Sequence, residues 1–118
     1  MTRHSFKDFV LDQLSALPGV RTRAMFGAYG LYQDEHFFGI LDESRLFFKT
    51  DAQSQADYAA RGMGAFTYES RGRTLTMSYH EVPPEVLENP AELVVWAQQA
   101  IRVAANNPNK PKKIRPQP

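Results

Sequence analysis

Cysteine and long apolar runs are both missing from this sequence, and each absence excludes a class of function. Without cysteine, the chain has no disulfide, no thiol nucleophile and no cysteine-ligated metal centre, a composition that fits a reducing cytoplasm. No apolar stretch approaches the ~20 residues that a membrane-spanning helix needs, and no apolar segment follows the charged N-terminal residues. We therefore expect a soluble, cytoplasmic protein without membrane contact.

Histidine is scarce, and its positions do not favour chemistry. The three histidines, at positions 4, 36 and 80, lack the spacing of metal-ligand pairs. The run Ser78-Tyr79-His80-Glu81 groups four reactive side chains, but successive residues of a strand point to opposite faces, so they do not form a catalytic triad. Gly27 and Gly30 give only G-x-x-G, without the lysine of a phosphate loop. The sequence predicts no catalytic residue, no metal, no cofactor and no enzyme.

Net charge is small, but it is unevenly distributed. Residues 106–118 hold four prolines, no acid and the cations Lys110, Lys112, Lys113 and Arg115. The body keeps ten of the fourteen basic residues and all thirteen acidic ones, or about −3. A mildly acidic body argues against a broad nucleic-acid footprint on the folded surface. The tail has too little apolar surface to offset the cost of ordering, so we expect residues 106–118 to be disordered.

Aromatic residues are abundant, especially between Arg21 and Lys49. Glycines and acidic turns divide this segment, which predicts three consecutive antiparallel strands near 27–33, 36–42 and 45–49. These strands carry apolar side chains in both parities, such as Leu31 beside Tyr32 and Phe37 beside Phe38. Either both faces of the sheet are partly covered, or one face presents aromatic side chains to a partner.

Helix signals flank these strands. Ser5 with Asp8 predicts a cap for a first helix that stops at Pro18, and Thr50 with Gln53 predicts a short helix ending at Arg61-Gly62. Two further strands follow at 65–69 and 73–79, and Asn89-Pro90 begins a last helix. The order α-βββ-α-ββ-α predicts one α+β domain over residues 1–105, with a two-layer architecture: a five-stranded, mostly antiparallel sheet with helices on one side.

Several motifs resemble those of the TfoX/Sxy N-terminal domain family. Residues 23–32, RAMFGAYGLY, resemble the family signature R-x-M-F-G-G-x-G-L-Y. Further matches follow in order: FG at 38–39, LFFKTD at 46–51, FTY at 66–68, MSYHEVP at 77–83 and the spacing of Leu93, Trp96 and Ala100. Ala28, His36 and His80 depart from the commonest family residues, which bears on turn geometry more than on membership.

The resemblance implies a secretion-chaperone-like α+β domain with an antiparallel sheet. It also implies a role in inducing competence genes alongside a cyclic-AMP-responsive activator, and it implies no enzymatic activity. Full-size regulators of the family add a C-terminal domain, whereas here thirteen residues follow the predicted domain.

Two hypotheses about function remain open at this point. The first is a non-enzymatic regulatory module that binds a protein, either the transcription machinery or a second copy as a dimer, through Arg23, Met25 and Phe26 at the start of the sheet. The second is a nucleic-acid-binding accessory protein, in which exposed sheet aromatics stack on bases and the tail cations Lys110, Lys112, Lys113 and Arg115 contact phosphates. A pocket of polar side chains with perturbed titration would instead indicate an enzyme.

Overall fold

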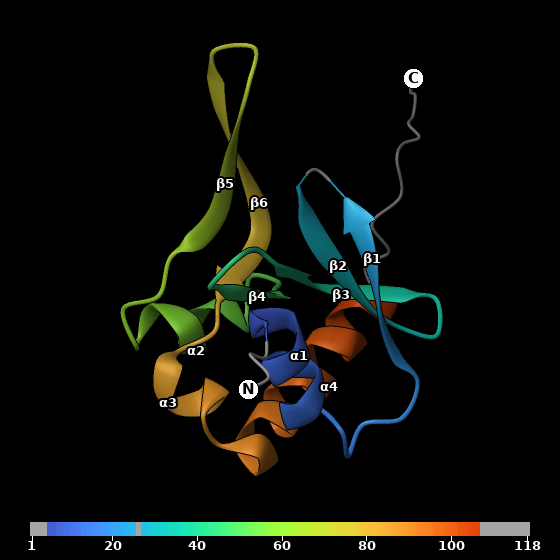
Figure 1. Cartoon of the computed structure of the whole chain (residues 1–118). Helices are drawn as coiled ribbons and strands as arrows, with labels where there is room; N and C mark the ends of the chain where they lie inside the picture. The colour runs from blue at the N-terminus through green and yellow to red at the C-terminus, as the bar shows by residue number, and fades with distance from the viewer. Residues whose placement is uncertain (1–4, 26, 107–118) are drawn as a thin grey trace.

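The computed structural model describes residues 5–25 and 27–106, in which the chain forms four helices and six strands (Figure 1). The helices are α1 (Phe6–Gln13), α2 (Gln55–Ala59), α3 (Pro84–Leu87) and α4 (Pro90–Asn106). The strands are β1 (Val20–Met25), β2 (Ala28–Gln33), β3 (His36–Leu41), β4 (Leu46–Lys49), β5 (Ala65–Ser70) and β6 (Arg73–Glu81). They form one sheet in the order β1-β2-β3-β4-β6-β5, and every neighbouring pair is antiparallel.

The predicted α+β architecture is confirmed. The helices lie together on one side of the sheet, and the β1–β2 and β5–β6 hairpins rise on the other side (Figure 1). The longest helix, α4, packs across β3 and β4, while α1 and α3 pack on α4, and α2 packs on β6. The sheet is therefore covered by helices on one face only.

The predicted count of five strands is one short in the described chain, because β1 precedes the aromatic strands. Its sequence, VRTRAM, has two arginines and no aromatic residue, so the residues give little of the usual strand signal. β1 lies at the edge of the sheet and pairs only with β2. An edge strand is stabilised by its partner strand and needs few apolar side chains of its own.

The helix caps agree with the sequence in two cases and differ in a third. The hydroxyl of Ser5 accepts a hydrogen bond from the Asp8 backbone N–H, and the Asn89 side chain accepts one from the Glu92 N–H, as predicted. The second helix differs, because the Asp51 carboxylate accepts from the N–H groups of Gln53 and Ser54 in place of the expected Thr50 cap. That helix consequently begins at Gln55, later than predicted.

The main core lies between the sheet and the helices. The sheet contributes Leu31, Phe38, Leu41, Leu46 and Phe48, and the helices contribute Val10, Tyr58, Val86, Leu93, Ala97 and Ala100. Alanine at three buried positions of α4, Ala104 being the third, leaves little side-chain bulk between this helix and the rest of the core. The short helix α3 was not predicted. It forms because Pro83 and Pro84 start a helical turn directly after the last strand, and it contributes Val86 to the core.

A second, smaller hydrophobic cluster lies on the opposite face of the sheet. It consists of Ile40, Phe47 and Tyr79, which are buried, with Ala28, Phe37, Phe66 and Met77 partly buried against them. Successive strand residues point to opposite faces, so Phe47 faces this cluster while its neighbours Leu46 and Phe48 face the main core. Both faces of the sheet are therefore packed, which explains the apolar side chains in both parities.

A bulge in β3 accounts for the rest of that pattern. Leu31 pairs with Gly39, but the next residue of β2, Tyr32, pairs with Phe37, so Phe38 has no partner in the register. The extra residue puts Phe38 and Gly39 on the side of the main core, while Phe37 and Ile40 take part in the other cluster. A bulge of this kind re-aims side chains along a strand.

Candidate interaction surface

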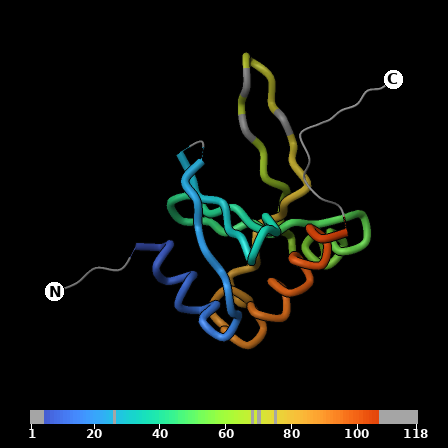
Figure 2. The backbone as a smooth tube through the Cα atoms, turned by 90° about the vertical axis from the view of Figure 1, so that its right-hand side faces the viewer, coloured from blue at the N-terminus to red at the C-terminus, as the bar shows by residue number. Residues whose placement is uncertain are grey.

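We call the sheet face that is turned away from the helices the second face. It is bordered by the β1–β2 and β5–β6 hairpins, and the backbone trace in Figure 2 shows both hairpins rising away from the helices. Aromatic rings pack against one another across it: Tyr32 stacks on Phe37 with centroids 5.0 Å apart, and Phe47 meets Phe66 edge-on at 4.9 Å. The rings are thus largely engaged with each other.

β1 places a row of three side chains on the second face. The register pairs Arg21 with Tyr32, Arg23 with Gly30 and Met25 with Ala28, and directly paired residues share a face of the sheet. A Cβ atom added at Gly30 would lie 3.1 Å from the Met25 sulfur and 3.0 Å from the Phe37 ring. The glycine therefore makes room for Met25 to pack onto the aromatic rings.

Arg21 and Met25 contact neighbouring residues of the sheet, which distinguishes them from Arg23. The Arg21 guanidinium lies 5.1 Å from the Tyr32 ring centre and donates a 2.6 Å hydrogen bond to the Asp34 carbonyl oxygen. Met25 is half-buried over Gly30, whereas Arg21 and Arg23 are both exposed. Because Arg21 is held by Tyr32 and Asp34, Arg23 is the exposed arginine of the row that is available to a partner.

Lys49 adds a buried cation to the second face. It is the last residue of β4, pairs with Tyr79 of β6, and is 7% exposed. Its ammonium group lies 5.0 Å from the centre of the Tyr79 ring and donates a 3.1 Å hydrogen bond to the Ser78 hydroxyl. Desolvation by burial lowers the pKa of Lys49 below its usual value. In the part of the chain that the structure describes, Lys49 forms no ion pair.

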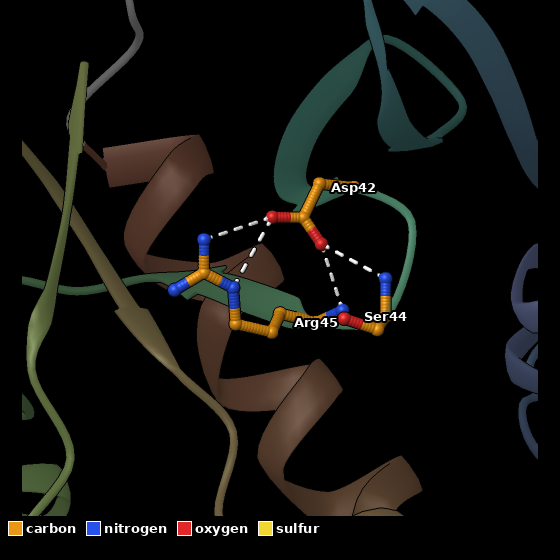
Figure 3. A network of polar contacts seen from close by, with 3 residues as sticks. All are labelled: Asp42, Ser44 and Arg45. Carbon is orange, nitrogen blue, oxygen red and sulfur yellow. Dashed lines mark hydrogen bonds and ion pairs between the residues drawn. The ribbon is translucent and has the colours of Figure 1, made fainter.

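A fourth cation, Arg45, lies at the turn that leads into β4 (Figure 3). One carboxylate oxygen of Asp42 accepts hydrogen bonds from the N–H groups of Ser44 and Arg45, and the other lies 3.2 Å from the Arg45 guanidinium. The guanidinium is also 5.3 Å from the Phe47 ring centre. The side chain is 55% exposed, so this pair contributes at most about 1 kcal/mol to stability and mainly orients the guanidinium over the ring.

The structure brings together two of the three residues predicted to contact a partner. Arg23 and Met25 lie on the same face of β1, whereas Phe26 lies outside the described residues. The predicted nucleic-acid contacts, Lys110, Lys112, Lys113 and Arg115, also lie outside them, so contact between the tail and phosphates stays a prediction. Sequence reasoning missed Arg21, Arg45 and Lys49. Side chains alternate between the two faces along the strand LFFK. This alternation could have indicated that Lys49 shares a face of the sheet with Phe47 and that Phe48 lies on the other face.

The sheet aromatics are more buried than the partner hypothesis assumed. Among the described residues, the large apolar side chains that count as exposed are Phe9, Tyr29 and Val95, at 36%, 37% and 59%. Phe9 and Val95 belong to helices, and Tyr29 points toward α1, where the Lys7 ammonium lies 4.4 Å from its ring centre. A partner on the second face would therefore meet exposed cations and half-buried side chains, and no open aromatic patch.

His80, on the helical side of β6, predicts a pH dependence of stability. Its Nδ1 lies 2.9 Å from the Thr50 hydroxyl, its ring is 5.8 Å from that of Tyr58, and burial lowers its pKa. His80 therefore binds a proton more readily in the unfolded chain than in the folded one. The free energy of unfolding should be unaffected by protonation of His80 above about pH 6.5 and should decrease as the pH falls below that value. Urea unfolding from pH 7.5 to 5.5 should show this decrease, and His80→Gln should remove it. An equal slope in both proteins would contradict the assignment.

Neither a metal centre nor a membrane segment is found in the described residues. No group of three or more histidine, aspartate or glutamate side chains is arranged there to hold a metal ion. No described helix combines the length and hydropathy needed to cross a membrane.

Comparison with known proteins agrees with the motifs. Residues 12–104 match the TfoX N-terminal domain. Protein Sxy of Escherichia coli is 27% identical over 94 residues, which cover 79% of this chain and 44% of that protein. The DNA transformation protein TfoX1 of Aliivibrio fischeri is 25% identical over 79 residues, which cover 67% of this chain and 38% of that protein. This chain thus matches less than half the length of either relative. By the match over most of its length, the chain belongs to the TfoX N-terminal domain family.

Proposed function

We propose that this protein is a non-enzymatic, cytoplasmic regulatory module that binds another protein through the second face of its sheet. The observation that carries the proposal is the row on β1, where exposed Arg23 lies two residues from half-buried Met25. No described helix covers this face (Figure 1), so the row is accessible from the side between the two hairpins. An arginine beside a large apolar side chain is a common composition for the centre of a protein interface.

The family supports a role in regulating DNA uptake. One relative is named a DNA transformation protein, and we extend that role to this chain as part of the proposal. The partner would be a component of the transcription machinery or a second copy of the chain. Because the match spans 44% or less of each relative's length, the proposal concerns a binding step that the N-terminal domain performs on its own.

The test is a pair of substitutions on β1 with matched controls on α4. Arg23→Glu and Met25→Asp should each weaken partner binding by about tenfold or more, as expected for central interface residues. Arg102→Glu and Val95→Asp make the same kinds of change at exposed side chains of α4 and should leave binding unchanged. Sedimentation of the pure protein measures self-association, and affinity capture followed by titration of the purified partner measures binding to another protein. Equal losses for the β1 and α4 variants would contradict the proposal.

A further inference from the structure

We propose that the second face recognises an acidic, extended segment of the partner, with one of its carboxylates bound to the Lys49 ammonium. This inference rests on the proposed function and specifies the chemistry of the partner. It depends on three features of the described residues: a buried cation without a counter-ion, an uneven distribution of charge between the two sides of the molecule, and an unpaired stretch of β6.

Lys49 provides the first feature. Its ammonium group has one hydrogen bond, to the Ser78 hydroxyl, and one aromatic neighbour, Tyr79, while the residue is 7% exposed. A buried charge normally has an oppositely charged partner, because removing an ion from water is costly. No carboxylate of the described chain lies within ion-pair distance of it. An incoming carboxylate would supply the missing counter-ion and use donors that Ser78 leaves available.

The distribution of charge provides the second feature. Arg21, Arg23 and Lys49 lie on the second face, and Arg45 lies beside it with its guanidinium 3.2 Å from the Asp42 carboxylate. In the strand register, Glu81 also lies near them, because it pairs with Phe47. The helices carry five acids, Asp8, Asp12, Asp57, Glu85 and Glu92, against two bases, Lys7 and Arg102. Arg61, which follows α2, pairs with Glu85 and Glu92, so Asp8, Asp12 and Asp57 account for most of the negative charge on the helical side. An acidic segment is therefore attracted to the second face and repelled by the helices. This distribution of charge favours binding at the second face and favours a partner with negative charge.

The shape of β6 provides the third feature. β4 pairs with β6 only over residues 79–81, and one more hydrogen bond joins the Thr50 N–H to the Ser78 carbonyl. From Arg73 to Met77, β6 has no strand partner on the β4 side within the described residues, and Thr74 and Thr76 are exposed. An extended segment can add to such an edge by backbone hydrogen bonds. The bound segment would begin beside Lys49, where β4 ends, and would pair with β6 along residues 73–77.

The same features favour a peptide over a nucleic acid. Bases bind to proteins by stacking on free aromatic faces, but here Tyr32 is stacked on Phe37 and covered by Arg21, and Phe47 meets Phe66 edge-on.

The experiment is an NMR titration of the isotope-labelled full chain with three probes. The first is a peptide of alternating glutamate and valine, the second replaces glutamate by lysine, and the third is a single-stranded oligothymidylate. We expect the glutamate peptide to shift the amide signals of Lys49 and of residues 73–79 and to bind at least about tenfold more tightly than the lysine peptide, which corresponds to about 1.4 kcal/mol.

Two lysine variants test the role of the ammonium group. Lys49→Met should weaken binding of the glutamate peptide by about tenfold, and Lys49→Arg, which keeps the charge, should retain most of it. Lys7→Met is the matched control, because Lys7 also lies over a tyrosine ring, but on the helical side. Thermal melting shows that each variant is folded before it is titrated.

The proposal is overturned if the two peptides bind equally, if the shifts lie on the helices, if Lys49→Met binds as well as Lys7→Met, or if the oligothymidylate binds this face more tightly. Failure here is distinguishable from failure of the proposed function. If Arg23→Glu loses a protein partner but Lys49→Met keeps it, the proposed protein-binding function stands and the acidic segment is rejected. If the glutamate peptide binds at Lys49 but no protein partner is found, the site for acidic segments stands and the proposed function is rejected.

Discussion

Replacing Phe48 by alanine is expected to lower the free energy of unfolding by about 3–5 kcal/mol. Phe48 is fully buried in the main core, with its ring centre 5.8 Å from that of Phe38. The helices hold this core closed, so the space left by the ring cannot collapse easily. Urea unfolding followed by tryptophan fluorescence measures the change, because the chain has one tryptophan, Trp96, which packs against the same core.

The neighbouring substitution, Phe47→Ala, is the informative comparison. Phe47 is nearly as buried, at 2% exposed, but it faces the second face, where Phe37, Phe66 and Met77 are only partly buried. These side chains can move into the vacated space, so the loss of stability should be smaller, about 2–3 kcal/mol. Phe9→Ala, at a 36% exposed position, should cost less than about 1 kcal/mol. A larger loss for Phe47→Ala than for Phe48→Ala would show that the second cluster is the more tightly packed one.

Replacing Gly39 by valine is the second change with a large expected effect. A Cβ atom at position 39 would lie 3.0 Å from the Phe47 carbonyl oxygen and 3.1 Å from a methyl carbon of Leu31. The carbonyl belongs to the β3–β4 pairing, so it cannot move away without disturbing the ladder. We expect a loss of about 1–3 kcal/mol, and a decrease in melting temperature of roughly 4–8 °C per kcal/mol.

Gly64→Ala is the control for this glycine. No atom lies within 4 Å of the position that its Cβ would take, and its φ angle is not in the left-handed region. The methyl group should be tolerated, and the less flexible unfolded chain could raise stability by about 0.4–1 kcal/mol. Calorimetry of the two variants beside the wild type separates steric crowding from a general effect of losing glycine. Similar melting temperatures for both variants would contradict the crowding argument.

The sequence predicts the layers of this fold well, because strong local signals mark most elements. Ser5 and Asn89 provide caps that the structure confirms, and the aromatic strands are dense enough to be recognised. β1 was not predicted, because an arginine-containing edge strand depends on β2 for its structure. Likewise, the bulge at Phe38 depends on pairing between strands, which no local pattern reports.

The candidate surface was predicted only in part, for a similar reason. Arg23 and Met25 were identified from the family motif at the start of the sheet, and the structure places them on one face. Lys49 and Tyr79 are thirty residues apart in the sequence and meet only because β4 pairs with β6. A lysine next to two phenylalanines gives no sign by itself that it is buried. Its surroundings come from β6, which supplies the Tyr79 ring and the Ser78 hydroxyl beside the ammonium group.

The bulge in β3 also determines how this strand would respond to a change in length. Phe38 is the unpaired residue, and Gly39 faces the same side of the sheet, against Leu31 and Phe48. Deleting Phe38 would therefore restore a regular pleat, with Phe37 and Ile40 still on the second face and a void in the main core. Deleting Gly39 would have the same effect on the alternation, whereas deleting Phe37 or Ile40 would exchange the inner and outer side chains along part of the strand. Within β3, positions 38 and 39 are thus the two at which a deletion keeps the remaining side chains on their present faces.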